Sequence, residues 1–505
     1  MDNFFIQALQ AVISWDILLL IMIGVFFGII AGAIPGFTVT MAIVLSFPFT
    51  FAMDPVSGVA LMIGIFVGGY SGGLVSGIML GIPGTPSSIC TVYDGFPMAQ
   101  KGEPGRALGL GIFSSFLGTV ISIIILVVMG PLVAKFSLNF GPWEISTLII
   151  FSLTLVGSLS QGSMLKGLLS GGVGLLITTF GISASGNVRF NFGFDVLSSG
   201  IQTLPVLIGA FAFSQLLRNV ETLSTSTEKQ KELSKVNTKV KIPYVQIMKD
   251  LWAMKFNLIR SGIIGSLIGA LPAVGGTAAN FVSYDQAKKL SKYPEKFGTG
   301  IRDGICAAEA SNNGVAGGAF IPTLTLGIPG NLPMAIMLGV LILHGITPGP
   351  MLFKNQPVLV GSIYVSLFVA AIFMVLLMFV FIRWFAQISQ VPQSILVPLV
   401  LMLCGVGSFA LNSSIFDVWT LFIFGIIGYL FSKAKVPLPP LVLGVVLGSN
   451  LEVSLLRAFE LDPHWTTFLT RPISAVMILL ILLSIVISIW QNLKIAKKLN
   501  NNITG

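Results

Sequence analysis

The chain has 505 residues, of which 54% are hydrophobic and only 9% are charged, and its formal net charge is +9. Water-soluble domains carry charge on about a quarter of their residues, so this composition excludes that class. The cationic excess lies in polar segments beside apolar runs, which argues against nucleic-acid binding. Because runs of roughly 20 apolar residues can cross a bilayer, we expect an all-α polytopic membrane protein.

Hydrophobic runs predict about 10 to 13 membrane-associated elements, some of them too short to span fully. In chain order they cover residues 17–34, 37–53, 57–80, 107–134, 145–160, 165–181, 200–217, 332–352, 361–382, 394–411, 417–431 and 472–490. The N-terminus lacks the basic region and small-residue cleavage site of a signal peptide, so we expect the first run to be retained.

One extended polar segment divides the chain. Residues 218–257 are rich in Lys, Glu, Ser and Thr, and we interpret them as a basic linker between a first membrane repeat at 1–217 and a second at 258–493. The tail at 494–505 also carries lysines. Because Lys and Arg concentrate in cytoplasmic loops, the linker and the C-terminal tail are predicted to be cytoplasmic.

A helix-breaking motif occurs in both halves. Gly-Ile-Pro-Gly stands at 81–84 and, about 246 positions later, at 327–330, each time within a long apolar run. Lipid offers no partners for freed backbone groups, so such a break is tolerable only against protein or a water-filled cavity. Matched breaks in two halves are typical of interrupted helices that meet near the bilayer midplane.

Ladders of small residues form a second matched pair. They precede Pro35 and, about 237 positions later, Pro272, and their members are Gly24, Gly28, Gly32, Gly36, Ser261, Gly265, Gly269 and Ala273. Such ladders allow close helix packing. Residues 258–287 lie between basic stretches, and each arm of about 14 residues, or roughly 21 Å of helix, is too short for a core of about 30 Å. We predict a re-entrant hairpin there and an equivalent tip at 35–40, for which two ordinary spans are the alternative.

A broken helix offers free carbonyl groups at one end and free N–H groups at the other. N–H groups at a positive dipole end suit a carboxylate, and the predicted substrate-binding residues are Thr85, Pro86, Ser87, Ser88, Gly330 and Asn331. Carbonyl, hydroxyl and amide oxygens suit an alkali cation, and the predicted ion-binding residues are Pro35, Gly36, Thr38, Thr40, Gly81, Gly84, Gly275, Thr277, Asn312, Asn313 and Gly327. Each polar side chain could instead satisfy only local backbone. Together the four breaks predict one enclosed site, with Na+ or H+ as the coupling ion and no other cofactor.

Two acidic residues near these motifs have different expected roles. Glu309 enters the apolar run before the second break, where an ionisable group indicates function; the alternative is an interfacial or helix-capping position. Asp94 is expected at a surface turn with Lys101 and Arg106.

Five further residues are expected to be structural, as buried thiols or isolated histidines. They are Cys90, Cys306, Cys404, His344 and His464. The sequence contains no phosphate-binding loop, Ser-His-Asp spacing or metal-ligand cluster. An enzyme and an ATP-driven pump are therefore not supported, and we expect no catalytic residues.

Five motifs, in their order along the chain, resemble one family. They are Gly-Ala-Ile-Pro-Gly at 32–36, Leu-Gly-Ile-Pro-Gly-Thr-Pro at 80–86, Tyr-Asp-Gly at 93–95, Ala-Ala-Glu-Ala-Ser-Asn-Asn-Gly at 307–314 and Leu-Gly-Ile-Pro-Gly at 326–330. This set resembles the large permease subunit of tripartite tricarboxylate transporters, the TctA family. The resemblance implies a symporter of the bacterial inner membrane that imports tricarboxylates or dicarboxylates, such as citrate, with a cation gradient.

The same resemblance implies partners and an architecture. A small integral membrane subunit and a periplasmic solute-binding protein are the expected partners, within membrane lipid, and a homodimer is left open. The expected fold has two repeats, in inverted topology, as in elevator-type transporters such as the TRAP large subunit. A passive anion channel or pore is the alternative function, because paired breaks can also build a selectivity filter.

Overall fold

The computed structural model describes residues 2–159, 164–221, 241–272, 274–388, 391 and 393–503. The chain divides into two compact units: unit 1 contains residues 1–135 and 215–411, and unit 2 contains residues 136–214 and 412–505. Each unit therefore takes segments from both predicted halves. Nearly half of the predicted linker, at 222–240, and the side chains of the tail lie outside the described residues, so the division into linker and tail stays a prediction.

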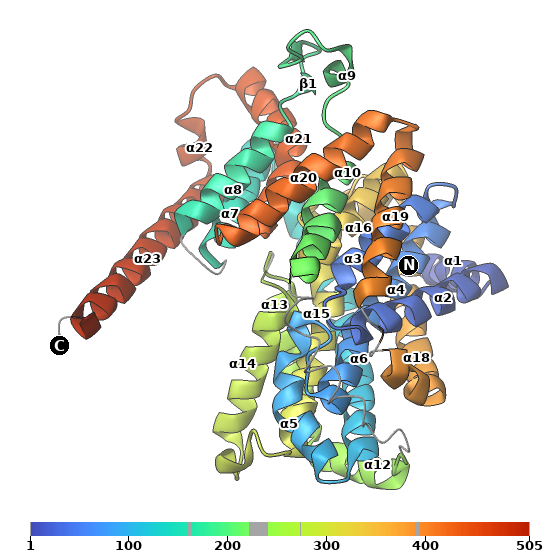
Figure 1. Ribbon diagram of the computed structural model, residues 1–505. Coiled ribbons are helices and arrows are strands. Elements are labelled where there is room, and N and C mark those ends of the chain that lie inside the picture. Colours follow the sequence, from blue (N-terminus) through green and yellow to red (C-terminus); the bar gives the residue numbers. More distant parts are fainter. Residues whose placement is uncertain are drawn as a thin grey trace. The chain divides into compact units, whose positions relative to one another are not determined.

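Unit 1 contains helices, joined by loops, and no strand among its described residues (Figure 1). Its first segment holds α1 (Asp2–Val12), α2 (Trp15–Ala33), α3 (Val39–Thr50), α4 (Pro55–Leu80), the 3-10 turn η1 (Pro86–Ser88), α5 (Ile89–Gln100) and α6 (Pro104–Ser137). Its second segment holds α12 (Tyr244–Ala253), α13 (Lys255–Gly269), α14 (Gly275–Leu290), the 3-10 turn η3 (Pro294–Lys296), α15 (Arg302–Leu326), α16 (Leu332–Leu343), α17 (Leu352–Asn355), α18 (Pro357–Ile388) and α19 (Gln393–Asn412). The run predicted at 332–352 is shorter as a helix, because Gly345 adopts a φ of 71° just after α16 ends.

The described residues of unit 2 form helices, the loops between them and one short hairpin. Its helices are α7 (Pro142–Leu159), α8 (Met164–Ile177), α9 (Asp195–Ser198), α10 (Thr203–Leu207), the π-helical η2 (Ile208–Phe213), α20 (Ile415–Lys433), α21 (Leu438–Leu461), α22 (Thr467–Thr470) and α23 (Pro472–Ile503). The strands β1 (Gly181–Ile182) and β2 (Val188–Arg189) pair antiparallel, with Gly181 opposite Arg189. A core cluster of Ile177, Val206, Phe424 and Val445 joins helices from both segments of this unit.

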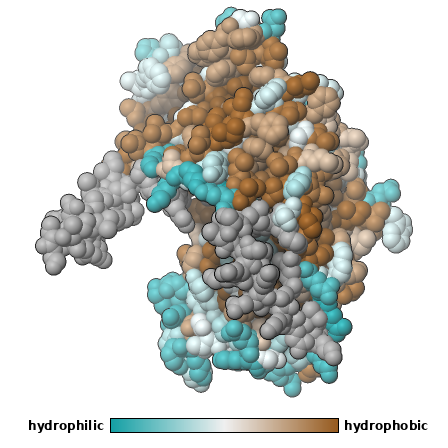
Figure 2. Space-filling view, viewed as in Figure 1, coloured by the Kyte–Doolittle hydropathy of each residue, from teal (hydrophilic) through white to brown (hydrophobic). Residues whose placement is uncertain are grey.

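Seven helices of the described chain are long and apolar enough to cross a membrane. They are α2, α4, α6, the segment Thr203–Glu221, α18, α20 and α21. Figure 2 shows apolar residues over most of the visible helix surface and hydrophilic residues around the lower ends of α5, α12 and α14. This pattern agrees with the predicted polytopic membrane protein.

Two buried helices, α4 and α15, form the centre of unit 1. Residues 57–80 of α4 and 304–325 of α15 are buried throughout. The small-residue ladders explain how neighbouring helices approach them so closely. A Cβ atom added at Gly28 on α2 would meet the backbone of Ile65 and Gly69 on α4, and one added at Gly265 on α13 would meet the backbone of Ser311 on α15. The ladders are therefore packing faces, as small residues at helix crossings usually are.

Part of the predicted linker is a packed helix. Asp250 on α12 is only 1% exposed and accepts hydrogen bonds from Arg106 Nε at 2.8 Å and from Arg302 Nη1 at 2.5 Å. Arg106 lies near the start of α6, and Arg302 is the first residue of α15. Buried carboxylates are stable when they are paired in this way, so Asp250 holds α12 against the ends of two long helices.

Candidate functional site

Both Gly-Ile-Pro-Gly motifs interrupt a helix of unit 1, as predicted. α4 is capped by Gly81 at a φ of 70°, and α15 is capped by Gly327 at a φ of 67°. Both angles are left-handed, a conformation that glycine adopts without steric cost and that commonly ends helices. The chain restarts as η1 and α5 after Thr85, and as α16 after Asn331.

The last glycine of each motif lies directly against another backbone. A Cβ atom at Gly84 would meet the carbonyl oxygen of Gly32 and lie 2.9 Å from the Cα atom of Gly73. A Cβ atom at Gly330 would lie 2.6 Å from the carbonyl oxygen of Gly269 and 2.7 Å from the Cα atom of Ala319. Each break therefore closes onto the end of the ladder helix of its own half, and glycine is required by this close approach.

Tyr70, in the middle of α4, joins elements from three of the four predicted breaks. Its carbonyl oxygen accepts a hydrogen bond from Asn312 Nδ2 at 3.0 Å, and its hydroxyl accepts one from Asn331 Nδ2 at 3.2 Å. A Cβ atom at Gly276, at the start of α14, would lie 2.9 Å from both the Tyr70 ring and the Ser87 Cβ atom. The structure thus brings Ser87, Gly276, Asn312 and Asn331 together around Tyr70. We call this group the Tyr70 cluster.

The sequence prediction missed Tyr70 itself. A tyrosine within a long run of glycines and aliphatic residues was the available signal, because a buried tyrosine hydroxyl usually needs a polar partner. Its partners Asn312 and Asn331 lie more than 240 positions away, and no local pattern reports such a contact.

Asn312 carries an unpartnered acceptor inside the Tyr70 cluster. The residue is fully buried, and among the described residues its Oδ1 atom has no hydrogen-bond partner. A Cβ atom at Gly276 would lie 3.1 Å from this oxygen. Burying an unpaired amide oxygen is costly, so this atom is the clearest candidate ligand for a small cation.

The neighbouring Asn313 has both amide groups engaged. Ser71 Oγ donates to its Oδ1 atom at 2.7 Å, and its Nδ2 atom donates to the carbonyl oxygen of Glu309 at 3.3 Å. Of the two adjacent predicted ion ligands, Asn312 therefore has the free oxygen, whereas Asn313 ties α15 to α4.

Of the predicted substrate residues after the first break, Thr85, Ser87 and Ser88 are buried and hydrogen-bonded to one another, whereas Pro86 is exposed. Thr85 Oγ1 lies 3.1 Å from Ser87 Oγ, and Ser88 Oγ donates to the carbonyl oxygen of Thr85 at 2.9 Å. Pro86 begins η1. These hydroxyls form a compact polar group at the start of η1 and α5. After the second break, Asn331 caps α16 by accepting a hydrogen bond from the Met334 amide at 2.9 Å.

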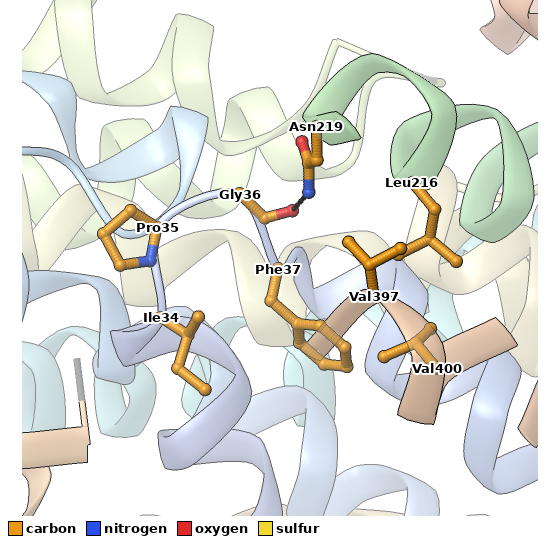
Figure 3. Close-up of a pocket in the computed structure, with 8 residues that line it drawn as sticks. All are labelled: Ile34, Pro35, Gly36, Phe37, Leu216, Asn219, Val397 and Val400. Atoms are coloured by element: carbon orange, nitrogen blue, oxygen red, sulfur yellow. Dashed lines mark hydrogen bonds between the residues drawn. The ribbon is translucent and has the colours of Figure 1, made fainter. Parts of the chain in front are cut away.

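The segment at 35–40, predicted as the first hairpin tip, lies beside a small apolar pocket of unit 1. Ile34, Pro35, Gly36, Phe37, Leu216, Asn219, Val397 and Val400 line it. Figure 3 shows the side chain of Asn219 reaching the carbonyl oxygen of Gly36, which it hydrogen-bonds at 3.3 Å. Thr38 caps α3 by accepting from the Met41 amide at 3.2 Å, and Thr40 is buried in the first turn of that helix. Among the described contacts, none joins Thr38 or Thr40 to the Tyr70 cluster.

The second hairpin tip is only partly described, because residue 273 lies outside the described residues. Gly275 opens α14 at a φ of 72°, and Thr277, in the same first turn, is half-buried. The arms α13 and α14 have 15 and 16 residues, close to the length argued from the sequence. Whether they re-enter the membrane stays a prediction.

Glu309 does not lie at an interface or a helix start. It lies in the third turn of α15 and is fully buried. Thr91 Oγ1 on α5 donates to its Oε1 atom at 2.5 Å, and Ser115 Oγ on α6 donates to its Oε2 atom at 2.8 Å. The alternative, that Glu309 occupies an interfacial or helix-capping position, therefore does not fit the structure.

The expectation that Asp94 lies at a surface turn is wrong. Asp94 is a fully buried residue of α5, and its carboxylate accepts hydrogen bonds from the Tyr284 hydroxyl at 2.8 Å and from three backbone amides. Those amides belong to Gly298, Gly300 and Ile301, at 2.8 to 2.9 Å. A buried carboxylate needs such donors, and the loop before α15 supplies them, so Asp94 holds this loop against α5.

The remaining residues expected to be structural agree with that expectation where the structure describes them. All three cysteines are free and buried. His344 packs with its Nε2 atom against Gly58, and His464 is exposed with its Nδ1 atom 2.8 Å from Asp462 Oδ1. The two histidines lie in separate units.

The chain is similar in sequence to a known protein family and to proteins of Agrobacterium vitis. The family model described as "Tripartite tricarboxylate transporter TctA family" matches residues 18–443. An uncharacterized 52.8 kDa protein in the TAR-I ttuC' 3' region of Agrobacterium vitis is 34% identical over 424 residues, which cover 82% of each chain. An uncharacterized protein in the TAR-II ttuC' 3' region of the same organism is 36% identical over 231 residues, which cover 46% of this chain and 96% of that protein. No solved structure matches the chain.

Proposed function

We propose that this chain, which belongs to the tripartite tricarboxylate transporter TctA family and is the membrane component of such a transporter, imports di- or tricarboxylates together with a coupling cation. Membership makes it a multi-pass transporter subunit and not an enzyme. The observation that carries the cation-coupled step is the unpartnered Asn312 Oδ1 atom within the Tyr70 cluster. In this proposal a periplasmic binding protein delivers the carboxylate and a small membrane subunit completes the assembly.

Equivalent contacts in the two halves support an internal repeat. Gly28 of α2 packs on Ile65 of α4, and Gly265 of α13 packs on Ser311 of α15. Gly265 lies about 237 positions after Gly28, which is the offset between the two ladders. Ser311 lies about 246 positions after Ile65, which is the offset between the two breaks. The contacts of Gly84 with Gly32 and of Gly330 with Gly269 follow the same offsets.

The directions of the two central helices support an inverted repeat. Phe66 packs edge-on against Phe320 at a ring separation of 6.1 Å, whereas Ser71, farther along α4, contacts Asn313, farther back along α15. The two helices therefore run antiparallel although they occupy equivalent places in the two halves. Inverted repeats whose broken helices meet at the centre are common in secondary transporters, and an elevator-type movement is part of our proposal.

An alkali cation at Asn312 Oδ1 would be held by hard oxygen ligands. The amide oxygen, hydroxyls near it and the carbonyl groups released at a helix break are donors of the kind that sodium accepts. The N-terminal ends of η1–α5 and α16 would offer N–H groups to the carboxylate. The cation supplies charge that compensates the anionic substrate, so cation and substrate would favour each other's binding.

Basic residues support the proposed orientation of unit 1. Lys101 follows α5, Lys249 lies in α12, Lys288 and Lys289 lie in the last turn of α14, and Lys292 and Lys296 lie in the segment after it. Figure 2 shows hydrophilic surface around the lower ends of these helices. Because positive residues favour the cytoplasmic side, this end would face the cytoplasm of the bacterial inner membrane.

Uptake by the reconstituted assembly tests the proposal. Proteoliposomes with the full chain, the small subunit and the loaded binding protein should accumulate radiolabelled carboxylate, with citrate as the first probe, only when an inward sodium or proton gradient is applied. Asn312→Ala should raise the half-saturating cation concentration about 10-fold or more, because it removes an ion–dipole contact of about 1.5 kcal/mol or more.

Asn139→Ala is the matched control, because it removes an amide whose Nδ2 atom bonds only the nearby Phe136 carbonyl among the described contacts. Its cation dependence should equal that of the unmodified protein. Uptake at full rate without any gradient, or unsaturable ionic current through single assemblies, would contradict coupled transport. Equal cation affinity in the Asn312 and Asn139 variants would remove Asn312 from the ion site.

A further inference from the structure

A buried carboxyl group lies one helical turn from the Tyr70 cluster. Glu309 is fully buried in α15 between α5 and α6, and each of its two oxygens accepts one hydroxyl hydrogen bond, from Thr91 and Ser115. Its aliphatic stem is close to the apolar wall of unit 1, since a Cβ atom at Gly111 would lie 3.5 to 3.7 Å from Leu74, Ile78 and Glu309 Cγ. The carboxyl group is thus enclosed by neutral side chains.

Charged and titratable groups nearby do not neutralise Glu309. Buried ones on the packed elements are Tyr70 on α4, Cys90 and Asp94 on α5 and Cys306 on α15, and half-buried Tyr284 lies on α14. The arginines of these elements bind other groups: Arg106 and Arg302 bind Asp250, and Arg260 binds Asn257. Within the described part of the chain, no cation forms an ion pair with Glu309.

An isolated buried carboxylate is expensive, whereas a buried carboxylic acid is not. The two hydroxyl partners suit both forms. A hydroxyl donates to a carboxylate oxygen, and by rotating it can accept a hydrogen bond from a protonated carboxyl group. Thr91 and Ser115 can therefore satisfy Glu309 with or without a proton, and no repacking of the three helices is needed.

The position of Glu309 connects it to the proposed ion site. Its own carbonyl oxygen accepts from Asn313 Nδ2, and Asn313 in turn binds Ser71 on α4. Its partner Thr91 lies three residues after Ser88, in the helix that follows the first break. Asn280 links the same segments, since it accepts from the Cys90 amide and donates to the Ala308 carbonyl oxygen. A change in charge at Glu309 would act on both the first break and the asparagine pair.

We propose that Glu309 binds and releases one proton from bulk water during the transport cycle, with the Thr91 and Ser115 hydroxyls as its rotating partners. The proton is a second ligand of the same core, distinct from the cation at Asn312, and its place in the cycle rests on the proposed transport function. On binding, the carboxylate becomes a neutral carboxylic acid; on release, the proton returns to water and the negative charge reappears.

Infrared difference spectroscopy of the purified full chain tests proton binding without requiring transport. In a titration from about pH 5 to about pH 9, the infrared carbonyl stretch of the protonated Glu309 carboxylic acid should disappear as the pH rises. Glu309→Gln should lack this change. Thr91→Val removes a donor that stabilises the carboxylate, so its band should persist to higher pH, which provides a second test if the glutamine variant folds poorly.

Glu144→Gln is the matched control, because Glu144 is a buried glutamate paired with Arg471 at 2.5 Å. Its difference spectrum should keep the Glu309 band. A Glu309 band that is absent, or that does not change across this pH range, would overturn proton binding and release.

Uptake measurements then separate this inference from the transport proposal. The pH dependence of uptake should be lost in Glu309→Gln, while the unmodified assembly retains it. An assembly that imports carboxylate with the same pH dependence in both forms would refute the role of Glu309 and leave cation-coupled transport standing. Spectra that show the band in a chain without gradient-driven uptake would refute the transport proposal alone.

Discussion

Alanine at Gly28 is expected to destabilise unit 1, because its side chain would collide with backbone that cannot rotate away. The new Cβ atom would collide with the Ile65 carbonyl oxygen. It would also lie 2.8 Å from the Gly69 nitrogen and 2.9 Å from the Ile65 carbonyl carbon. Ordinary contacts between carbon atoms are about 3.5 to 4.0 Å, so α2 and α4 would have to separate locally by roughly 1 Å. Overpacking of this kind costs about 1 to 3 kcal/mol.

The upper part of that range applies here, since all three contacts are with backbone. The higher helix propensity of alanine returns about 1 kcal/mol, and the net loss is about 2 kcal/mol. Gly405→Ala is the matched control within the same unit, because an added Cβ atom in α19 meets no described atom within 4 Å apart from its chain neighbours and the nearby backbone of its own helix. That substitution should be neutral or stabilising by up to about 1 kcal/mol.

Thermal unfolding of the two purified variants, followed by intrinsic tryptophan fluorescence, provides the measurement. Gly28→Ala should lower Tm by several degrees, and Gly405→Ala should leave it unchanged or raise it. Equal Tm values for both variants would show that the α2–α4 crossing tolerates a methyl group. The reasoning from backbone contact would then be refuted, and with it the explanation of the glycine ladder.

Two further predictions concern the polar contacts that hold loops and short helices against unit 1. Asp94→Ala removes the acceptor of three loop amides and should lower the free energy of unfolding by about 2 to 4 kcal/mol, so trypsin should cleave the chain faster at Lys292 and Lys296. The control Asp285→Ala replaces an exposed aspartate on α14 and should not change that rate. Unchanged cleavage in both variants would show that Asp94 does not hold the loop. Asp250→Asn replaces the carboxylate that binds two arginines and should speed hydrogen exchange in α12 about 10-fold or more, whereas an unaltered exchange rate would mean that apolar contacts alone hold this helix.

Local features of the sequence predicted the helix breaks well. A left-handed glycine can end a helix wherever it occurs, and a following proline cannot continue the hydrogen-bond ladder, so Gly81 and Gly327 follow from short-range chemistry. The same holds for the short arms α13 and α14. The sequence was misleading at Asp94, because Tyr-Asp-Gly is a common turn pattern, whereas here the three residues lie within α5 and the partners of Asp94 come from a loop about 200 positions away.

The candidate site was predictable in its residues but not in its connections. The sequence proposed Asn312 and Asn313 as equals, and they differ only because Ser71, from another helix, reaches one of them. Thr38 and Gly36 were grouped with the other breaks, yet the first tip contacts Asn219 and an apolar pocket instead. Such outcomes depend on which faces of distant helices meet, which periodicity along one segment does not report.

By itself, the sequence determined the class of protein, the matched breaks and the small-residue faces, because membrane insertion, glycine conformation and close helix packing depend on residues near one another in the chain. Only the tertiary structure decided that Tyr70 gathers three breaks, that Asn312 keeps a free oxygen and that Glu309 is enclosed by hydroxyls. Those properties arise when α4, α5, α6, α14 and α15 pack together, since burial and hydrogen-bond partners are set by helices that are remote in sequence.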